Sequence, residues 1–314
     1  MNNFTLNKLK NISIQNKHKT LYVFIYICMI FFMIIVSQYL SGLNFLNPNN
    51  SLFINPEAFN EDFSVYPLKE EDNHVFTYNI TLGKENFNHL KGSEYKLIFD
   101  GIHDNAIKVW FNGHLVISEG DLVKGHSMMR ASHVYGSIEN TMIKDSNTLK
   151  IKTYADYRTG SENRIVITDK ASGERAINLL NFLNIKLIIL GVGFIIMSVL
   201  FLLIIFVLNR QGNQLLLYLS LATFFIAFYF LDFMPSVYLT TSYIFYKKVF
   251  LFNLSLGILF YGIAIYSLIS KKYLLILSFA QLIFNIIAMS ISKDMIQFKI
   301  YYTYFYYSYN SLSM

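Results

Sequence analysis

Cysteine, proline and charge are all scarce in this chain of 314 residues, which holds one Cys and four Pro. The lone Cys28 lies in an apolar run, where it acts as a small hydrophobe, and no disulfide can form within the chain. Four prolines and 15 glycines exclude collagen-like and proline-rich architectures. Charged residues make up 15% of the chain, whereas a soluble globular protein has about 25%.

Hydrophobic residues are correspondingly abundant. They make up 54% of the chain, with 29 Phe and 23 Tyr, and the mean hydropathy is +0.39. This composition excludes an ordinary cytosolic enzyme and a disordered chain.

Charge is unevenly distributed along the chain, although the net charge is +6. Residues 1–20 carry four lysines and no acid, residues 41–180 carry 18 acidic and 14 basic side chains, and residues 181–314 carry two acidic and eight basic ones. The basic residues border apolar runs instead of forming one patch, so the pI of about 9.1 does not indicate nucleic-acid binding. We expect them to flank membrane spans.

The first apolar run covers residues 21–40 without a charge, long enough to cross about 30 Å of hydrocarbon. The lysines before it are expected to hold residues 1–20 in the cytoplasm. The run is longer than the apolar core of a secretory signal and no small-residue cleavage site follows it, so we favour an uncleaved anchor over a cleaved signal. Both alternatives place residue 41 onward outside the cytoplasm.

Four further apolar runs follow the polar middle of the chain, and each has the length of a transmembrane helix. We predict spans at residues 187–208, 215–231, 249–269 and 273–291. Residues 295–314 hold Lys299 and six tyrosines, so they are either a partial span or a segment at the membrane interface.

Orientation can be checked from the loops between these spans. With residues 41–180 outside, Arg210 and the Lys271–Lys272 pair lie in cytoplasmic loops, as the positive-inside rule requires. The Lys247–Lys248 pair lies outside, against that rule. The N-terminal lysines and the long polar domain decide the orientation.

Contacts between the spans should depend on small and polar residues, because lipid is as apolar as leucine. We expect close helix contacts at Gly191, Gly193, Gly257, Gly262 and Ala264. We expect interhelical hydrogen bonds, more than a ligand or relay site, at Asn253, Gln281 and Asn285.

The segment between the first and second spans is predicted to be a linker over residues 41–70 and a β-sandwich over residues 71–175. Alternating apolar residues indicate strands around residues 74–82 and 94–99, and later strands are expected at 132–138, 148–155 and 164–168. Asn112-Gly113 lies between alternating flanks and is the strongest short hairpin signal, because both turn residues need positive φ. Roughly seven short strands without a convincing helix favour an all-β jelly roll, followed by an α-helical transmembrane bundle.

The hairpin run from Ile107 to Val116, which reads IKVWFNGHLV, resembles the galactose-binding-like jelly roll of sugar-binding domains. The order of anchor, outer jelly roll and apolar spans resembles the bacterial seven-transmembrane receptors with diverse intracellular signalling modules, over about residues 20–291. The resemblance implies a sensor in the bacterial inner membrane, multi-pass, with residues 41–180 extracytoplasmic and a GGDEF diguanylate cyclase or histidine kinase as output. This chain has four spans and one partial span where the family has seven, and no output module, so we expect a receptor truncated before its output domain or the sensor part of a longer product.

Candidate binding residues follow from the predicted jelly roll. Trp110 shares the polar face of its strand with Lys108, where it can stack on a sugar ring or pack beneath a covering loop. Jelly-roll ligands commonly sit at the loop ends of the sandwich, which adds Arg130 in residues 121–130, and Tyr157 and Arg158 in residues 156–163.

Catalytic and metal chemistry find little support in the sequence. Asp100 and Asp104 are the right residue type for a glycosidase pair, but acids at a strand-to-loop junction are more often turn formers. His103 and His114 alone do not supply the three or four ligands of a metal site. We therefore predict no enzyme, no cofactor and no metal.

The function we predict is a membrane sensor whose outer jelly roll binds a small ligand, such as a carbohydrate, and biases the helices through residues 174–186. The alternative is a passive, membrane-anchored carbohydrate-binding or structural protein without signalling. A transporter is weakened by the near absence of charges within the spans. The expected partners are the bilayer and the ligand, with no nucleic acid, and a homodimer is compatible with this hypothesis.

Overall fold

The computed structural model describes residues 43, 45–69, 74–123, 125, 127, 129, 133–209, 214–233, 239 and 241–301. The predicted cytoplasmic N-terminus, the predicted anchor at residues 21–40 and most of the predicted partial span at residues 295–314 lie outside these residues. The chain divides into two compact units, Met1–Asn47 and Pro48–Met314, and the description that follows concerns the second.

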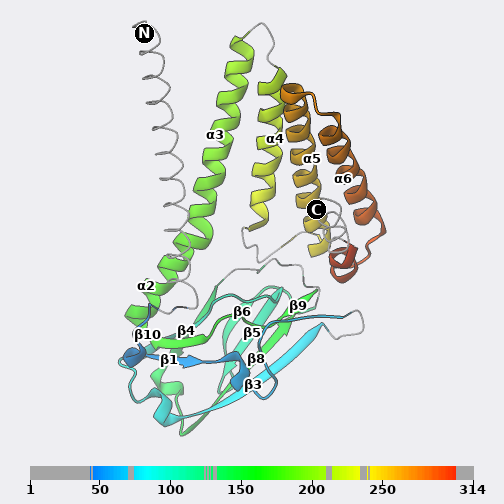
Figure 1. Cartoon of the computed structure of the whole chain (residues 1–314). Helices are drawn as coiled ribbons and strands as arrows, with labels where there is room; N and C mark the ends of the chain where they lie inside the picture. The colour runs from blue at the N-terminus through cyan, green and yellow to red at the C-terminus, as the bar shows by residue number, and fades with distance from the viewer. Residues whose placement is uncertain are drawn as a thin grey trace, which may run out of the picture. The chain divides into compact units, whose positions relative to one another are not determined.

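The first part of this unit is an antiparallel β region (Figure 1). Its strands are β1 (Ser51–Ile54), β2 (Tyr66–Pro67), β3 (Val75–Gly83), β4 (Glu94–Phe99), β5 (Ala106–Phe111), β6 (His114–Glu119), β7 (Val134–Glu139), β8 (Ser146–Tyr154), β9 (Arg158–Thr159) and β10 (Ile165–Asp169). Short 3-10 turns join several of them: η2 (Pro48–Asn50), η3 (Pro56–Ala58), η4 (Lys84–Phe87) and η5 (Asn140–Met142).

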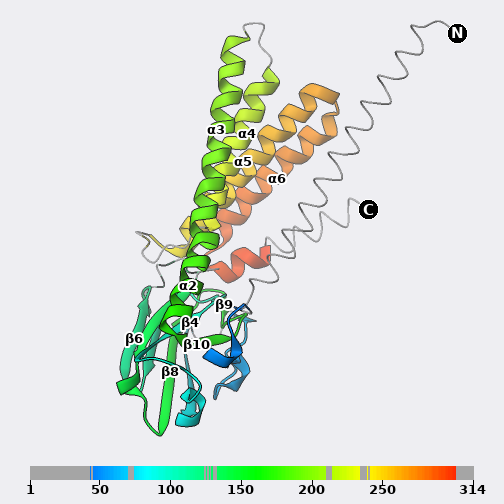
Figure 2. The same ribbon diagram turned by 90° about the vertical axis from the view of Figure 1, so that its left-hand side faces the viewer.

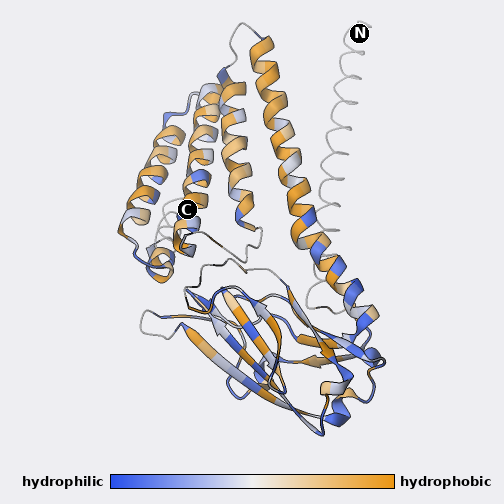
Figure 3. Ribbon diagram, turned by 180° about the vertical axis from the view of Figure 1, so that it is seen from behind, coloured by the Kyte–Doolittle hydropathy of each residue, from blue (hydrophilic) through white to orange (hydrophobic). Residues whose placement is uncertain are grey.

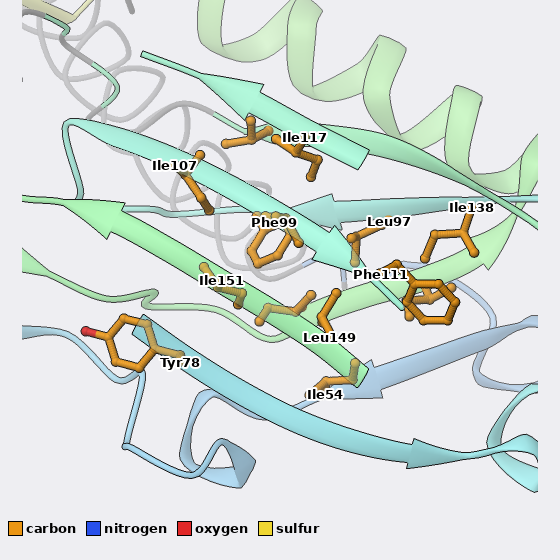
Figure 4. Close-up of a cluster of buried hydrophobic side chains, with 14 of the residues drawn as sticks. Ile54, Tyr78, Leu97, Phe99, Ile107, Phe111, Ile117, Ile138, Leu149 and Ile151 are labelled. Carbon is orange, nitrogen blue, oxygen red and sulfur yellow. The ribbon is translucent and has the colours of Figure 1, made fainter. Parts of the chain in front are cut away.

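Two four-stranded sheets share one hydrophobic core. Their strand orders are β1-β10-β4-β7 and β3-β8-β5-β6, and β2 pairs separately with β9. Leu97 and Ile138 face the core from the first sheet, and Leu149, Ile151 and Phe111 face it from the second (Figure 4). The alternation that predicted these strands is thus explained by one buried face on each sheet.

The β5–β6 hairpin is formed as predicted. Asn112 has a φ of 50° and Gly113 a φ of 85°, the two left-handed residues that the turn requires. The Asn112 side chain adds its own contacts, because its Nδ2 donates to the Met142 carbonyl at 2.8 Å and its Oδ1 accepts from the Thr148 amide at 2.8 Å. The asparagine therefore fixes both the turn and the neighbouring strand end.

The segment predicted to be a linker, residues 41–70, contains a strand of the first sheet. β1 pairs with β10 from Ser51↔Thr168 to Ile54↔Ile165, and Ser51 Oγ donates to Thr168 Oγ1 at 2.8 Å. A strand of four residues shows no measurable alternation of its own. It is defined by its partner strand, which lies more than 110 residues further along the chain.

Helix α2 (Lys170–Asn181) begins directly after β10 and packs against β4 and β10. Asp169 caps it by accepting from the Ser172 amide at 3.0 Å. A side chain at Gly173 would meet Lys96 Cβ at 2.5 Å, so only glycine permits this close approach to β4. The last strand of the sheet is thereby continuous with the first helix.

The helical part of the unit continues without a loop through a π-helical segment, η6 (Phe182–Lys186), and then runs through α3 (Leu187–Leu208), α4 (Gln214–Phe230), η7 (Leu231–Phe233), α5 (Tyr243–Ile269) and α6 (Lys272–Ile291). Neighbours in the sequence are neighbours in space, since α3 contacts α4, α4 contacts α5, and α5 contacts α6 (Figure 2). Residues 295–301 form a further short helix.

Four of these helices are long and apolar enough to cross a membrane, which agrees with the four predicted spans (Figure 3). The predicted bounds match α3, α4 and α6 to within one residue at each end. Helix α5 differs, because it begins at Tyr243 and therefore includes Lys247 and Lys248, which the sequence placed in a loop.

The small residues divide into two groups. A Cβ on Gly257 would lie 2.8 Å from Ile226 of α4, and one on Gly262 would overlap the Ser278 side chain of α6, so close contacts at these two glycines are confirmed. Ala264 is fully buried. At Gly191 and Gly193 nothing among the described residues lies within 4 Å of an added Cβ, so the described residues show no close helix contact at these two positions of α3.

One of the predicted interhelical hydrogen bonds is present. Asn285 of α6 is buried, and its Nδ2 donates to Ser255 Oγ of α5 at 2.6 Å. Asn253 instead donates to the Val249 carbonyl of its own helix at 2.8 Å. Gln281 is half-buried.

Candidate functional site

A cavity of about 240 Å³ lies where the β region meets the helices. The β region contributes Tyr157 and Arg158 to its lining, and the helical part contributes the polar or charged residues Tyr229, Asp232, Lys247 and Lys299. Leu251, Met295 and Phe298 complete the wall.

The β2–β9 pair holds the two β-region residues in place. The Leu68 amide donates to the Tyr157 carbonyl at 2.9 Å, and Arg158 and Thr159 pair with Pro67 and Tyr66. A small sheet therefore fixes the backbone of the tyrosine and of the two residues that follow it.

Tyr157 stacks on a tyrosine of the helical part. Its ring centroid lies 6.3 Å from that of Tyr243, at the start of α5, with 7° between the planes. Lys299 Nζ lies 5.3 Å from the Tyr157 ring, and Lys247 Nζ lies 5.3 Å from the Tyr243 ring. Cations at this distance are attracted by the face of an aromatic ring. The stacked rings and the two lysines therefore connect the β region, helix α5 and the helix at residues 295–301.

A buried ion pair forms one wall of the cavity. Asp232 lies in the short helix η7, which follows α4, and Lys247 lies in α5. Lys247 Nζ donates to both carboxylate oxygens of Asp232, at 2.6 and 2.7 Å. The two side chains are only 7% and 11% exposed. Removing two charges from water is costly, and the two hydrogen bonds between Lys247 and Asp232 offset that cost.

Two buried polar atoms of the lining lack partners. Tyr157 Oη and Arg158 Nε are buried and find no hydrogen-bond partner among the residues that the structure describes. The Tyr157 side chain is itself almost completely enclosed, with 7% of the residue exposed. Buried donors are nearly always satisfied in folded proteins, so these two atoms are exceptions.

Behind the cavity, a buried carboxylate holds the loop that carries Tyr157. Asp104 accepts from Thr159 Oγ1 at 2.7 Å and from the Gly160 amide at 3.0 Å. The Tyr78 hydroxyl lies 3.1 Å from the same Thr159 oxygen. Burial raises the pKa of Asp104 to about 7 and also raises the pKa of Tyr78.

This network predicts a pH dependence of stability. The pKa of Asp104 lies above its ordinary 3.8 in the folded state. Between about pH 4 and pH 7 the folded protein therefore keeps a proton on Asp104 that the unfolded chain has already released. Stability should fall as pH rises through that window and then level off. Asp104→Asn, which mimics the protonated form, should remove this fall. Thermal unfolding at several pH values, followed by the fluorescence of Trp110, measures both profiles, and parallel profiles would contradict the assignment.

Trp110 suits this measurement because it is the single tryptophan of the chain and lies on β5.

Of the residues predicted from sequence, the structure brings Tyr157 and Arg158 together at the cavity. Trp110 and Lys108 lie elsewhere, half-buried on the outer side of the second sheet, where their strand partners on β8 are Lys150 and Lys152. Neither lines the cavity. Arg130 lies outside the described residues.

The acids and histidines considered for chemistry have structural contacts. Asp100 accepts from Asn163 Nδ2 at 3.1 Å, and His103 Nε2 lies 2.6 Å from the Glu162 carboxylate. His114 begins β6 opposite Phe111. Within the described part of the chain, no three His, Cys, Asp or Glu side chains gather as a metal site would require.

The helical half of the site was not predicted from the sequence, where Lys247 entered only the orientation argument and Asp232 was not singled out. A signal was available, since ionisable residues beside an apolar run commonly pair with one another. These two residues are 15 positions apart, and only the packing of α4 on α5 shows that they meet.

Comparisons with known proteins add little. No family model matches the chain, and no curated protein does. A candidate β-galactosidase from Bacteroides fragilis, known from a crystal structure, is similar at 16% identity and a TM-score of 0.22. The similarity covers 31% of this chain and only 16% of that one. A TM-score this low supports neither a shared fold nor a shared function.

Proposed function

We propose that the protein is a membrane sensor whose β region lies outside the cytoplasm, binds a small ligand and biases the arrangement of the helices. The observation that carries this proposal is the cavity lined jointly by Tyr157 and Arg158 of the β region and by Asp232, Lys247 and Lys299 of the helical part. A ligand there contacts both parts at once. It can therefore favour one arrangement of the helices over another, which is what a sensor requires.

The strand order supports a jelly roll as the binding domain. With the short strands β2 and β9 set aside, the eight remaining strands form two four-stranded antiparallel sheets in which strands distant in sequence are neighbours. A jelly roll divides eight strands between two sheets in this manner. The galactose-binding-like jelly roll binds sugars, so a carbohydrate is one ligand class under this proposal.

The ion pair of α5 weakens one objection to the proposed orientation. Lys247 belongs to the basic pair that the positive-inside rule would not place outside. Because Lys247 pairs with Asp232, its charge is neutralised locally and it contributes little to that rule. Arg210, Lys271 and Lys272 favour the same orientation as the N-terminal lysines, whereas Lys248 still lies on the outer side.

The proposed protein is a receptor and not an enzyme. Asp104 is fully buried and holds the loop of Thr159 and Gly160, where no substrate reaches it. We propose that output passes to a cytoplasmic module such as a GGDEF diguanylate cyclase or a histidine kinase.

Orientation is tested with single cysteines in a Cys28→Ser background. Val123→Cys reports on the β region, where Val123 is 84% exposed, and Asn209→Cys reports on the exposed loop after α3. A membrane-impermeant maleimide added to intact cells should label position 123 at once and position 209 only after permeabilisation. The reverse pattern would overturn the proposal.

Signalling is tested by the distance between two spin labels. Asn209→Cys and Lys271→Cys follow the ends of α3 and α5 that lie away from the β region. Pulsed electron resonance in nanodiscs should show a changed distance when a bound sugar from a panel containing galactose and glucuronate is present. Binding with an unchanged distance would instead support a passive, membrane-anchored binding protein.

A further inference from the structure

We propose that the outer face of the second sheet, β3-β8-β5-β6, binds an extended acidic polysaccharide (Figure 1). Each strand of this sheet turns alternate side chains toward the core and toward the opposite face. We call the centre of that opposite face the lysine face, and its residues are Lys108, Trp110, Leu115, Lys150 and Lys152. It is separate from the cavity, so the proposal goes beyond the sensor function and does not depend on it.

The pairing of β5 with β8 brings three lysines and the tryptophan together. Lys108 lies directly opposite Lys152, and Trp110 lies directly opposite Lys150. Side chains in such pairs have Cβ atoms about 4.5–5.5 Å apart, and the next pair on the same face lies roughly 7 Å further along the strands. The sequence does not show this patch, because its lysines come from two strands that are distant in the chain.

No acidic side chain among the described residues neutralises this patch. The three lysines form no ion pair with the described part of the chain, whereas Lys84, Lys96 and Lys170 of the same β region each bond to a carboxylate. Acidic residues begin at the border of the patch, where Asp121 and Asp156 interact with Tyr154 at the end of β8. The flanking outward positions on β3 and β6 are uncharged: Thr77, Asn79 and Ser118.

This arrangement costs stability in the free protein, because like charges directly opposite each other on a sheet repel. Composition does not account for it, since residues 41–180 carry more acidic than basic side chains. A bound polyanion would place negative charge between Lys108 and Lys152 and remove the repulsion. Charge complementarity of this kind attracts and orients a charged partner.

Trp110 adds an apolar surface to the charged one. It is half-buried, and Leu115, which lies opposite it on β6, is 53% exposed. A large aromatic ring presents an apolar face, on which the C–H side of a sugar ring can pack. Sugar rings that carry carboxylates therefore match both the tryptophan and the lysines, whereas a polyphosphate matches only the lysines.

The shape of the surface favours an extended ligand. The lysine face is one side of a four-stranded sheet, and helix α2 packs on β4 and β10 of the other sheet. The side chain of Lys150 is exposed to solvent. The face of a sheet does not enclose a small molecule, so affinity must come from several weak contacts along a polymer.

Binding is tested on the full chain in phosphatidylcholine nanodiscs by calorimetric titration with an oligogalacturonate, its methyl ester and polyphosphate. The oligogalacturonate should bind about tenfold more tightly than the ester, which has the same rings without the charge. It should also bind more tightly than polyphosphate at equal charge concentration. Because Trp110 is the single tryptophan, a change in its emission on binding would report contact at this face.

The lysines are tested by combining Lys108→Gln with Lys152→Gln, which should weaken binding by about twofold to thirtyfold. Each lost lysine should also lower the slope of log affinity against log salt concentration by about 0.7. The matched control is Lys91→Gln, which removes an exposed lysine from the loop before β4 of the other sheet. It should leave both the affinity and the slope unchanged.

The tryptophan is tested by Trp110→Leu, which keeps an apolar side chain but removes the ring. This variant should bind the oligogalacturonate about twofold to tenfold more weakly. Circular dichroism shows whether it is folded, and if it is not, the lysine variants and the methyl ester carry the test.

Stability provides a second readout for the lysines. Lys152→Gln removes the repulsion with Lys108, so thermal unfolding of the free protein, followed by Trp110 emission, should shift upward by about 1–2 °C. The same variant should bind the oligogalacturonate more weakly. A substitution that merely damaged the sheet would lower both the stability and the affinity.

The proposal is overturned if the oligogalacturonate does not bind, or if its methyl ester or polyphosphate binds as tightly. Equal losses of affinity in Lys91→Gln and in the lysine double variant would also reject the lysine face. Phosphatidylglycerol vesicles that displace the oligogalacturonate would assign the face to a lipid surface instead of a polysaccharide. None of these results concerns the cavity, so the sensor proposal stands or fails separately.

Discussion

Replacing Asp232 by asparagine is expected to destabilise the helical bundle by about 3 kcal/mol. The substitution keeps the shape of the side chain but leaves Lys247, which is 7% exposed, as a buried charge without its counter-ion. Breaking a buried pair costs about 3–5 kcal/mol, and the lower value applies because asparagine still accepts one hydrogen bond. Unfolding in mixed detergent, followed by helical circular dichroism, measures the change.

The chain offers a matched control for this prediction. Lys84 and Asp145 also form an ion pair, at 3.4 Å, but their side chains are 61% and 97% exposed. Asp145→Asn should therefore have no measurable effect, because exposed pairs are screened by water and salt. Removing both buried charges with Asp232→Asn and Lys247→Met should recover most of the lost stability. Equal effects of Asp232→Asn and Asp145→Asn would show that the Lys247 pair is not buried in the membrane-embedded protein.

Replacing Gly160 by alanine is expected to cost the β region several kcal/mol, of the order of 3 or more. Gly160 has a φ of +105°, and an added Cβ would lie 2.5 Å from the Ser64 carbonyl oxygen and 2.6 Å from that of Phe63. Backbone atoms cannot move away as a flexible side chain can.

Gly113→Ala separates the two causes of this loss. Gly113 also has a positive φ, of +85°, but nothing lies within 4 Å of an added Cβ. It should cost only the conformational penalty of about 1–2 kcal/mol. Trp110 fluorescence during denaturant unfolding reports both variants. A similar loss for the two would mean that backbone conformation, and not the contact with residues 63–64, makes glycine necessary at position 160.

The elements predicted most accurately from sequence are those whose signal is contained within the element. The Asn112-Gly113 turn is determined by two adjacent residues, and the spans are determined by continuous apolar runs. β1 was missed because its four residues become a strand only by pairing with β10. Close contacts are found at Gly257 and Gly262 but not, among the described residues, at Gly191 and Gly193, because composition does not tell which small residues lie where two helices approach each other.

The residues of the candidate site likewise divide into those that a local pattern in the sequence predicts and those that only tertiary packing reveals. Tyr157 and Arg158 could be selected from their position in a loop at the end of the predicted sandwich. Trp110 and Lys108 were selected by residue type on an exposed strand face, and the structure places them away from the cavity. The pairing of Asp232 with Lys247 and the stacking of Tyr157 on Tyr243 depend on tertiary packing, which no local pattern encodes.

The π-helical segment η6 joins a helix that is fixed to the sheet to the first described span. A π turn holds about one more residue than an α turn, and each residue of an α-helix corresponds to about 100° around the axis. Conversion of this segment to regular α-helix would therefore turn α3 by roughly a quarter of a revolution relative to α2 while advancing it by only about 1.5 Å. Such a conversion would turn the far end of α3 about its axis far more than it would shift it along that axis.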